Sequence, residues 1–167
     1  YDLLMVQEHS ARPDQMAAIR AALKETHNES ILTGLDPEDV HQTAGVGFLS
    51  TLGNTVYRLE PRSTKMKLLT SNGRICMAAF QLQPGIIVHC ITIYGWSGGR
   101  FNTCLAARTD DMVAAVADET KMWHHDYWLL GGDLNADRSH LPHWDGLINI
   151  NQWVDLGGQD AGAYGGQ

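Results

Sequence analysis

The sequence predicts a layered α/β protein with mixed sheets. Three observations lead to this prediction: short apolar runs typical of buried strands, segments whose apolar residues recur at three- and four-residue steps, and a hairpin turn at residues 83–85. Strands that alternate with helices pack in layers around a core, and a hairpin joins antiparallel strands. Because no internal repeat or linker divides the chain, we expect one domain over residues 1–167.

The first half of the chain is expected to contain three strands and one helix. Residues 2–7 form an almost continuous apolar run that ends at Glu8, as a strand buried on both faces does. A helix then begins near Pro13, whose fixed φ suits a first helical turn, and ends by about residues 27–28. Polar residues, glycine and proline predict a loop over residues 33–42. Strands on either side of a turn are expected at residues 45–50 and 55–59.

The second half is expected to contain a hairpin, a long helix and a further strand. The hairpin pairs residues 74–81 with residues 86–94, and a loop follows at residues 95–100. The helix covers about residues 109–124, where apolar side chains share one face. Residues 126–130 then lead into a Gly-Gly-Asp-Leu-Asn sequence.

The composition describes an ordinary globular protein and argues against a broad nucleic-acid-binding surface. The hydrophobic fraction is 44%, and 12 Lys and Arg stand against 19 Asp and Glu, a formal net charge of -7. Binding to a polyanion without regard to sequence needs many cations. A nucleic-acid substrate stays possible, because bound divalent cations reverse the local charge of an acidic cleft. No apolar run approaches the ~20 residues that cross a bilayer, so no membrane span is expected.

The cysteines indicate an intracellular protein. Cys76 and Cys90 lie in apolar, strand-like runs, Cys104 is distant from both, and no Cys-x-x-Cys pair suggests zinc. We expect buried, reduced thiols, which are compatible with an intracellular setting. The chain starts at Tyr1 rather than at Met and shows no secretory signal, so we interpret it as a piece of a longer polypeptide.

Residues with the chemistry of a metal site follow two of the apolar strands. Glu8 comes after the first strand, and Asp133 and Asn135 come after the last one. Ligand-binding groups of α/β proteins gather at strand ends, because the core holds them while loops leave room for a ligand. Two residues apart on an extended chain, Asp133 and Asn135 are expected to point to the same face. The two glycines before Asp133 permit close backbone approach or unusual dihedral angles.

Four sequence blocks resemble those of the endonuclease/exonuclease/phosphatase family, the group similar to DNase I and to the abasic-site repair endonucleases. The resemblance covers about residues 1–156, and a Gly-Asp-x-Asn motif becomes specific when Gln-Glu lies far upstream of it. It implies a two-sheet α/β sandwich with helices on the outer faces, of which this chain supplies a part. The blocks are the strand that ends in Gln7-Glu8, residues 45–50, residues 91–94 and residues 131–135.

The resemblance also implies roles for four residues. Glu8 matches a Mg²⁺ ligand, and Asp133 is expected to bind the same ion, Mg²⁺ or Mn²⁺. Asp133 and Asn135 match residues that hold the attacking water and the scissile phosphate, and Tyr94 matches a tyrosine close to that phosphate. These residue types suit the roles, because Mg²⁺ prefers oxygen ligands and keeps several waters, so one or two protein carboxylates suffice.

Two parts of the family pattern are missing from this chain. The family begins with a strand that carries an Asn and ends with a strand that closes in Ser-Asp-His. Here nothing precedes Tyr1, and no Ser-Asp-His follows Asp133. Loss of one acid–base or electrostatic contact lowers a rate about 10²–10⁴-fold. Because the first and last strands of the family pattern are missing, we expect the rest of the parent polypeptide to be needed to complete the fold.

Several other residues allow both a structural and a functional interpretation. Tyr94 suits a core aromatic at a strand end as well as a site residue. His140 and His143 have a spacing that invites zinc, but Pro142 is expected to break the helix that would align them. Arg100 suits a contact to a substrate phosphate or a solvated loop. Trp96, Trp144 and Trp153 suit either of two roles, stacking on bases or filling gaps in the packing.

Two hypotheses from different classes follow. The first is a domain for divalent-metal hydrolysis of phosphodiester bonds, an endonuclease with a nucleic-acid substrate; its incompleteness fits the fragmentary copies of retrotransposons. The family also contains lipid and inositol phosphatases, sphingomyelinases and deadenylases, and the loops of this sequence do not choose among these substrates. The second hypothesis is a catalytically inactive remnant or binding module that lacks the Ser-Asp-His strand, binds Mg²⁺ weakly and cuts nothing.

Overall fold

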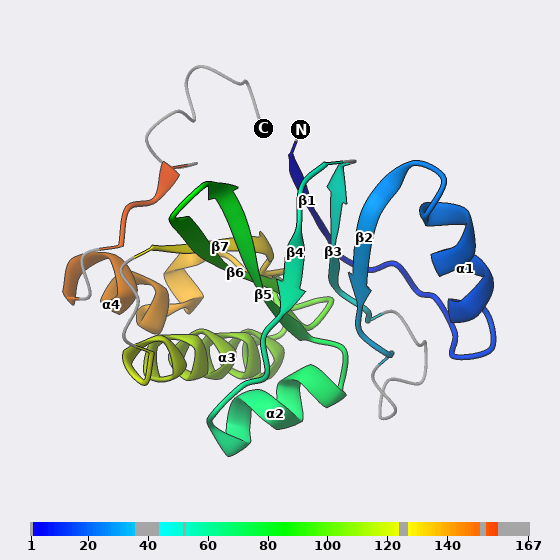
Figure 1. Ribbon diagram of the computed structural model, residues 1–167. Helices are drawn as coiled ribbons and strands as arrows, with labels where there is room; N and C mark the ends of the chain where they lie inside the picture. Colours follow the sequence, from blue (N-terminus) through cyan, green and yellow to red (C-terminus); the bar gives the residue numbers. More distant parts are fainter. Residues whose placement is uncertain (1, 36–43, 52, 124–126, 151–152, 157–167) are drawn as a thin grey trace.

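The computed structural model describes the chain except for residues 1, 36–43, 52, 124–126, 151–152 and 157–167. Within the described residues, the strands form two sheets with helices outside them (Figure 1). The smaller sheet is antiparallel, in the order β1 (Leu3–Val6), β3 (Gly47–Thr51), β2 (His27–Leu32). The larger sheet has the order β4 (Val56–Arg58), β5 (Ile75–Gln83), β6 (Ile86–Tyr94), β7 (Trp128–Asp133), with only β6 and β7 parallel among these pairs.

Side chains that point alternately to the two faces of the central strands divide the core into two layers. Cys76, Phe80 and Cys90 of the larger sheet share an apolar cluster with Phe48 of the smaller sheet, whereas Met77 belongs to a second cluster on the helix side. Because successive side chains of a strand point to opposite faces, a strand between two layers is apolar throughout. Burial raises the pKa of the Cys76 and Cys90 thiols to about 12, as suits the core thiols predicted there.

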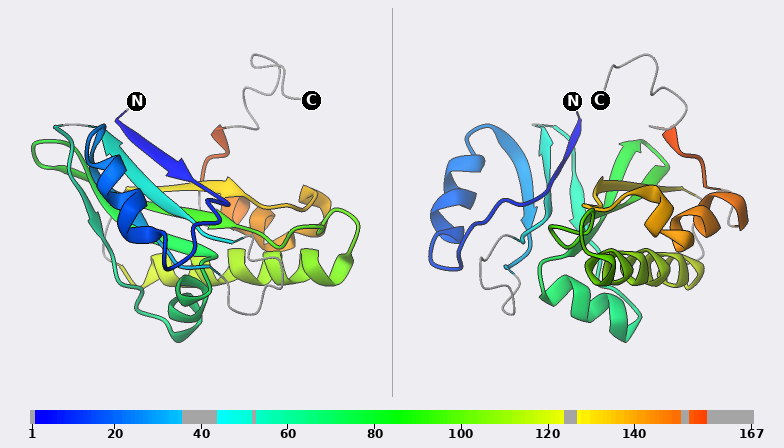
Figure 2. Two further views of the ribbon diagram at one scale, coloured as in Figure 1. Left: turned by 90° about the vertical axis from the view of Figure 1, so that its right-hand side faces the viewer. Right: turned by 180° about the vertical axis from the view of Figure 1, so that it is seen from behind.

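Helices cover the outer face of the larger sheet. α2 (Thr64–Ser71) and α3 (Thr103–Lys121) lie along this face, with Met66, Met112 and Ile91 in one buried cluster (Figure 1). α1 (Met16–Leu23) lies beside β2, and α4 (Pro142–Ile150) lies at the opposite end of the molecule (Figure 2). The layered two-sheet architecture with outer helices that the sequence predicted is therefore confirmed.

A buried carboxylate fastens the start of α2 to the end of α3. Glu119 is fully buried and accepts hydrogen bonds from the backbone N–H groups of Arg62 and Ser63, at 2.6 and 2.8 Å, and from the Trp123 indole at 3.0 Å. Burial by itself raises the pKa of Glu119. The hydrogen bonds to the charged form outweigh burial, so the pKa lies below its usual value.

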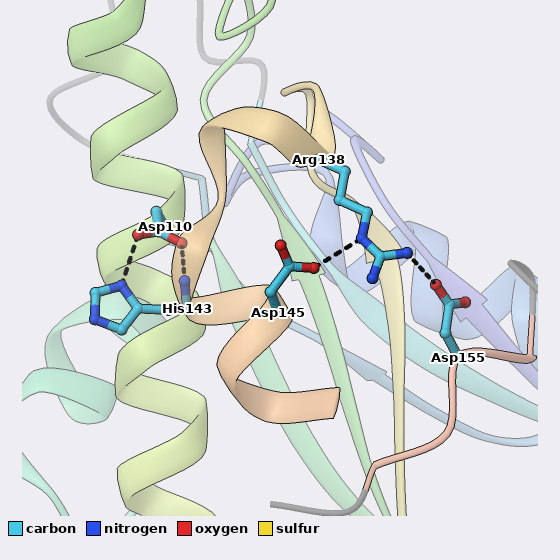
Figure 3. Close-up of polar contacts among 5 residues, drawn as sticks. All are labelled: Asp110, Arg138, His143, Asp145 and Asp155. Carbon is cyan, nitrogen blue, oxygen red and sulfur yellow. Dashed lines mark hydrogen bonds and ion pairs between the residues drawn. The ribbon is translucent and has the colours of Figure 1, made fainter. Parts of the chain in front are cut away.

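α4 is fastened to α3 by Asp110 (Figure 3). The buried Asp110 carboxylate accepts a hydrogen bond from the backbone N–H of His143 at 2.9 Å and lies 2.6 Å from Nδ1 of the His143 ring. A carboxylate at the first turn of a helix satisfies a free N–H group and interacts favourably with the helix dipole. Arg138 pairs with Asp145 of α4 at 2.9 Å and with Asp155 at 3.8 Å, which ties α4 to the segments on either side of it.

β2 and α2 were not predicted, because their apolar signal is short, and neither was α4. β2 lies where a helix was expected to end, and among its residues whose burial is described only Ile31 and Leu32 are buried. α2 buries Met66 and Leu69 alone, too few to establish a helical period. The expected loop over residues 33–42 falls mostly outside the described residues.

The start of α3 also differs from the prediction. α3 begins at Thr103 rather than near residue 109, because Asn102 caps it by accepting hydrogen bonds from two backbone N–H groups. Its expected end at residue 124 lies outside the described residues. Pro142 is the first residue of α4, where a missing N–H costs nothing, and His140 precedes it on a separate 3₁₀ turn, so no single helix aligns the histidine pair, as expected. In the described part of the chain, no helix has the length and apolar character needed to cross a membrane.

Candidate active site

Gln7 joins the end of β1 to the larger sheet. Its side-chain amide donates a 2.8 Å hydrogen bond to the hydroxyl of Thr92, a fully buried residue of β6. The backbone turns directly afterwards, since Glu8 has a φ of 51°, in the left-handed region that is unfavourable for most side chains. Glu8 therefore leaves β1 at a fixed place, next to the end of β6.

Tyr94, the last residue of β6, is the point at which predicted site residues meet. Its hydroxyl lies 2.9 Å from Ser97 Oγ, and the Glu8 carboxylate and the Asn135 side chain lie close enough to influence its pKa. The pKa of Tyr94 is raised, chiefly by burial; the Glu8 carboxylate raises it further, while Ser97 and Asn135 act in the opposite direction. Tyr94 therefore keeps its proton at neutral pH and serves as a hydrogen-bond donor.

Asp133 and Asn135 form a turn rather than the extended segment expected from their spacing. β7 ends at Asp133, Asn135 has a φ of 53°, and the Asn135 backbone N–H donates to Asp133 Oδ1 at 2.9 Å. Asp side chains accept such bonds from the backbone two residues on, and Asn tolerates the left-handed region. The expectation of two side chains on one face of a strand was wrong, but the turn still brings both residues to the wall of one cavity.

Parallel pairing places Asp133 beside Tyr94. The two residues are opposite each other in the β6–β7 register, and the Gly95 N–H donates to the Asp133 carbonyl at 2.7 Å. Gly132 permits this approach, because its φ is 149° and a Cβ there would lie 2.1 Å from the Ile93 carbonyl oxygen. A glycine before Asp133 is thus a requirement of the strand pairing that positions the acid.

A buried arginine lies behind Tyr94 and Asn135. Arg74 is 2% exposed, and its guanidinium donates to the Gly95 carbonyl at 3.3 Å and lies 5.6 Å from the centre of the Tyr94 ring. The Asn135 side-chain amide donates to the same carbonyl at 3.2 Å. A cation near an aromatic face is attracted to it. Arg74 therefore supports both Tyr94 and, through the shared carbonyl, the orientation of Asn135.

His9 holds the backbone after Glu8 against β3. Its N–H donates to the Gly45 carbonyl at 3.2 Å, its Nδ1 accepts from the Ala11 N–H at 3.0 Å, and a Cβ on Gly45 would lie 2.5 Å from its ring. Burial lowers the pKa of His9, and a hydrogen bond to the Thr33 backbone only partly opposes this effect. The ring is therefore neutral at pH 7, and its place is structural.

A cavity of about 530 Å³ opens beside Asp133 and Asn135. The loop after Tyr94 contributes Arg100 and Phe101 to its lining, and Arg100 pairs with Asp137 at 3.5 Å. The complete lining consists of Gly98, Arg100, Phe101, Gly132, Asp133, Leu134, Asn135 and Ala136.

The oxygen donors around Tyr94 fit a Mg²⁺ ion. Glu8 and Asp133 supply carboxylates, and Asn135 supplies an amide oxygen. Mg²⁺ binds oxygen ligands and keeps several waters, so a site with two protein carboxylates suits it. Among the residues that the structure describes, no three His, Cys, Asp or Glu side chains form a group able to hold a metal ion.

The structure thus brings Glu8 and Asn135 near Tyr94 and places Asp133 opposite Tyr94 through strand pairing. Their roles in catalysis and metal binding stay predictions. Sequence reasoning missed the side chains that support them, since single polar residues within strands and loops carry no local signal of a distant partner. These supporting residues are Thr92, Arg74 and Ser97.

The other interpretations left open by the sequence are resolved in part. Nδ1 of His143 is engaged by Asp110, and His140 lies on a separate 3₁₀ turn, so the pair is not aligned on one helix for zinc. Trp96 packs on the helix side of the larger sheet, between Arg74 and Arg108, at 5.1 and 4.5 Å from its ring centre. Trp96 therefore fills a packing position.

Solved structures share this fold, although no protein-family model and no curated protein matches the sequence. Beta toxin from Staphylococcus aureus matches with a TM-score of 0.58 and 12% identity, over 90% of this chain and 58% of the toxin. The human Nocturnin catalytic domain with bound sulfate matches with a TM-score of 0.53 and 11% identity, over 93% of this chain and 64% of that domain. ANGEL2, a 2′,3′-cyclic phosphatase in complex with adenosine-2′,3′-vanadate, matches with a TM-score of 0.52 and 14% identity, over 82% of this chain and 40% of the ANGEL2 chain.

The chain spans less than two thirds of the length of each of these structures. The likeness extends over 82% or more of the present chain. The chain therefore has the DNase I-like fold of the endonuclease/exonuclease/phosphatase family, over the part of that fold which it spans.

Proposed function

We propose that this chain carries the site of a phosphodiesterase that uses Mg²⁺ or Mn²⁺ to hydrolyse nucleic acid. One observation carries the proposal: Glu8 and Asn135, which are far apart in the sequence, both lie near enough to Tyr94 to influence the pKa of its hydroxyl, and Asp133 lies opposite Tyr94 on the next strand. Acids that converge at strand ends beside a cavity are the usual setting for a bound ion and its substrate.

Each residue has a distinct part in the proposed reaction. Glu8 and Asp133 hold the ion, which, when bound, polarises a phosphoryl oxygen and offsets charge on the leaving oxygen. Asp133, at the cavity wall, orients the attacking water and accepts its proton. Tyr94 keeps its own proton, because its pKa is raised, and so can donate a hydrogen bond to a phosphate oxygen.

Asn135 acts first as an orienting residue in this structure. Its amide donates to the Gly95 carbonyl at 3.2 Å. A primary amide has two N–H groups, so one is engaged by this carbonyl and the second is the one we assign to a phosphate oxygen.

The solved structures are compatible with phosphate chemistry. Nocturnin is described with a bound sulfate, and ANGEL2 is named a 2′,3′-cyclic phosphatase and holds an adenosine vanadate. Both ligands are tetrahedral or phosphate-like oxyanions. They support a phosphoester substrate for this chain, and the nucleic-acid substrate is our inference from the sequence resemblance.

Nicking of supercoiled plasmid tests the proposal. We expect the protein to nick plasmid in Mg²⁺ but not in EDTA, and Asp133→Ala to lower the rate at least 10²-fold. Asp111→Ala is the matched control, because Asp111 is an exposed acid on α3. Equal nicking by Asp133→Ala would remove Asp133 from the mechanism. Absence of both nicking and Mg²⁺ binding in the unaltered protein would favour the inactive binding module.

A further inference from the structure

Phe101 is exposed at the wall of the proposed active site. Its side chain is 94% exposed, more than any other large apolar residue in the described part of the chain. It nevertheless lines the same cavity as Asp133 and Asn135. Water competes poorly for an apolar ring, so this ring offers an apolar contact surface next to a polar centre.

The loop that carries Phe101 is held in place. The Phe101 N–H donates to the Gly98 carbonyl at 2.9 Å, and the Asn102 N–H donates to the same carbonyl at 3.1 Å. Gly99 packs so closely on the turn after Asp133 that a Cβ there would lie 2.6 Å from the Asn135 carbonyl oxygen. The backbone that carries the ring is therefore held near Asn135, and a ligand that contacts Phe101 costs little loop entropy on binding.

An arginine and an aromatic ring are neighbours on this loop. Arg100 precedes Phe101 and pairs with Asp137 at 3.5 Å, which draws the loop toward the segment after Asn135. Arginine and aromatic side chains together bind phosphate and base in single-stranded nucleic acids.

We infer that Phe101 is the stacking platform for a nucleobase whose phosphate lies at Asp133 and Asn135. The inference rests on the proposed function and makes it more specific, because it names the residue that holds the base. A choline head group would also contact an aromatic face, so competition with phosphocholine is part of the test.

A mononucleotide tests this inference without any bond being cut. The probe is 2-aminopurine riboside 5′-monophosphate, whose fluorescence is quenched when the base stacks; it contains no phosphodiester bond. We expect saturable quenching by the unaltered protein in Mg²⁺, and a Kd about 10-fold higher for Phe101→Ala, as befits one base–aromatic stack. Phe101→Tyr, which keeps the ring, should bind within about 2-fold of the unaltered protein.

Leu82→Ala is the matched control, because Leu82 is an apolar residue of β5 that is 58% exposed. Competition then identifies the ligand class: AMP should displace the probe, whereas ribose 5-phosphate and phosphocholine at the same concentration should not. Absent quenching, an unchanged Kd in Phe101→Ala, or equal displacement by ribose 5-phosphate or phosphocholine would each overturn the inference. Plasmid nicking that depends on Asp133 would still stand in those cases, so the two failures are distinguishable.

Discussion

The Gln7 amide and the Thr92 hydroxyl form a 2.8 Å hydrogen bond that joins the two sheets one residue before Glu8. Thr92 is fully buried in β6, two residues before Tyr94. The bond therefore links the strand that delivers Glu8 to the strand that delivers Tyr94. It explains how an acid from one sheet reaches a hydroxyl in the other.

Removal of this bond should loosen the site at a small cost in stability. We expect Thr92→Val, which keeps the side-chain shape, to lower the free energy of unfolding by about 1 kcal/mol in urea denaturation and to weaken Mg²⁺ binding. Thr70→Val is the matched control, because the Thr70 hydroxyl of α2 is buried without a hydrogen-bond partner. That variant should be neutral or more stable. A Thr92→Val protein with unchanged stability and Mg²⁺ affinity would show that the bond does not position Glu8.

Gly132 should tolerate no side chain. We expect Gly132→Ala to destabilise the protein by about 2 kcal/mol or more, because the variant would combine a φ of 149° with a Cβ 2.1 Å from the Ile93 carbonyl oxygen. At Gly146 in α4, a Cβ would have no heavy atom within 4 Å beyond its own helix backbone and chain neighbours, so Gly146→Ala should stabilise the helix by up to about 1 kcal/mol. Thermal unfolding of both variants measures the contrast, and equal melting temperatures would contradict it.

Glu119 should make the protein sensitive to acid. Its folded-state pKa lies below the ordinary value of 4.5, so its contribution to stability is present above that value and is lost as the pH falls through the folded pKa. Glu119→Gln places an N–H group against donors that need an acceptor, and should cost about 1.5–3 kcal/mol at pH 7. Urea denaturation should show that the deficit of the variant shrinks as the pH falls from above 4.5 through the folded pKa. A deficit that stays constant with pH would mean that Glu119 does not titrate in this way.

Arg74 should affect turnover more than it affects substrate affinity. We expect Arg74→Met to lower kcat about 10- to 100-fold, because Tyr94 and Asn135 both lose a fixed neighbour, while KM changes little. Arg108→Met is the control, since Arg108 lies over the same Trp96 ring from an exposed position on α3. Steady-state kinetics on a nucleic-acid substrate separates the two parameters. A change confined to KM would assign Arg74 to substrate binding instead.

The parts of the site predicted from the sequence are those that a strand end and a motif mark together. Glu8 and Asp133 each follow an apolar run, and the Gly-Asp-x-Asn motif drew attention to Asn135. Arg74 and Ser97 were missed, because their partners are determined by strand register and by the turn after β6, neither of which a local pattern contains. The predicted geometry of Asn135 was also wrong, since the Asp133 side chain accepts a hydrogen bond from the Asn135 backbone N–H and the extended chain ends there.

The fold was predictable to a similar extent. β5 and β6 were found because both of their faces are buried, and α3 because its apolar face is long. α2 and β2 were missed because each buries only two residues and takes its stability from neighbours. α4 was missed, because proline ends a helix when it stands inside one but is tolerated at the first residue, where Pro142 lies.

The central claim is that Glu8 and Asp133 hold the same divalent cation. Binding of Mn²⁺, followed through the electron paramagnetic resonance signal of the free ion, measures this directly in the unaltered protein, Glu8→Gln and Asp133→Asn. We predict one shared ion per chain, and an affinity at least about 10-fold weaker in each single variant. Undiminished Mn²⁺ affinity in either variant would contradict the account, because the two carboxylates would then not share an ion.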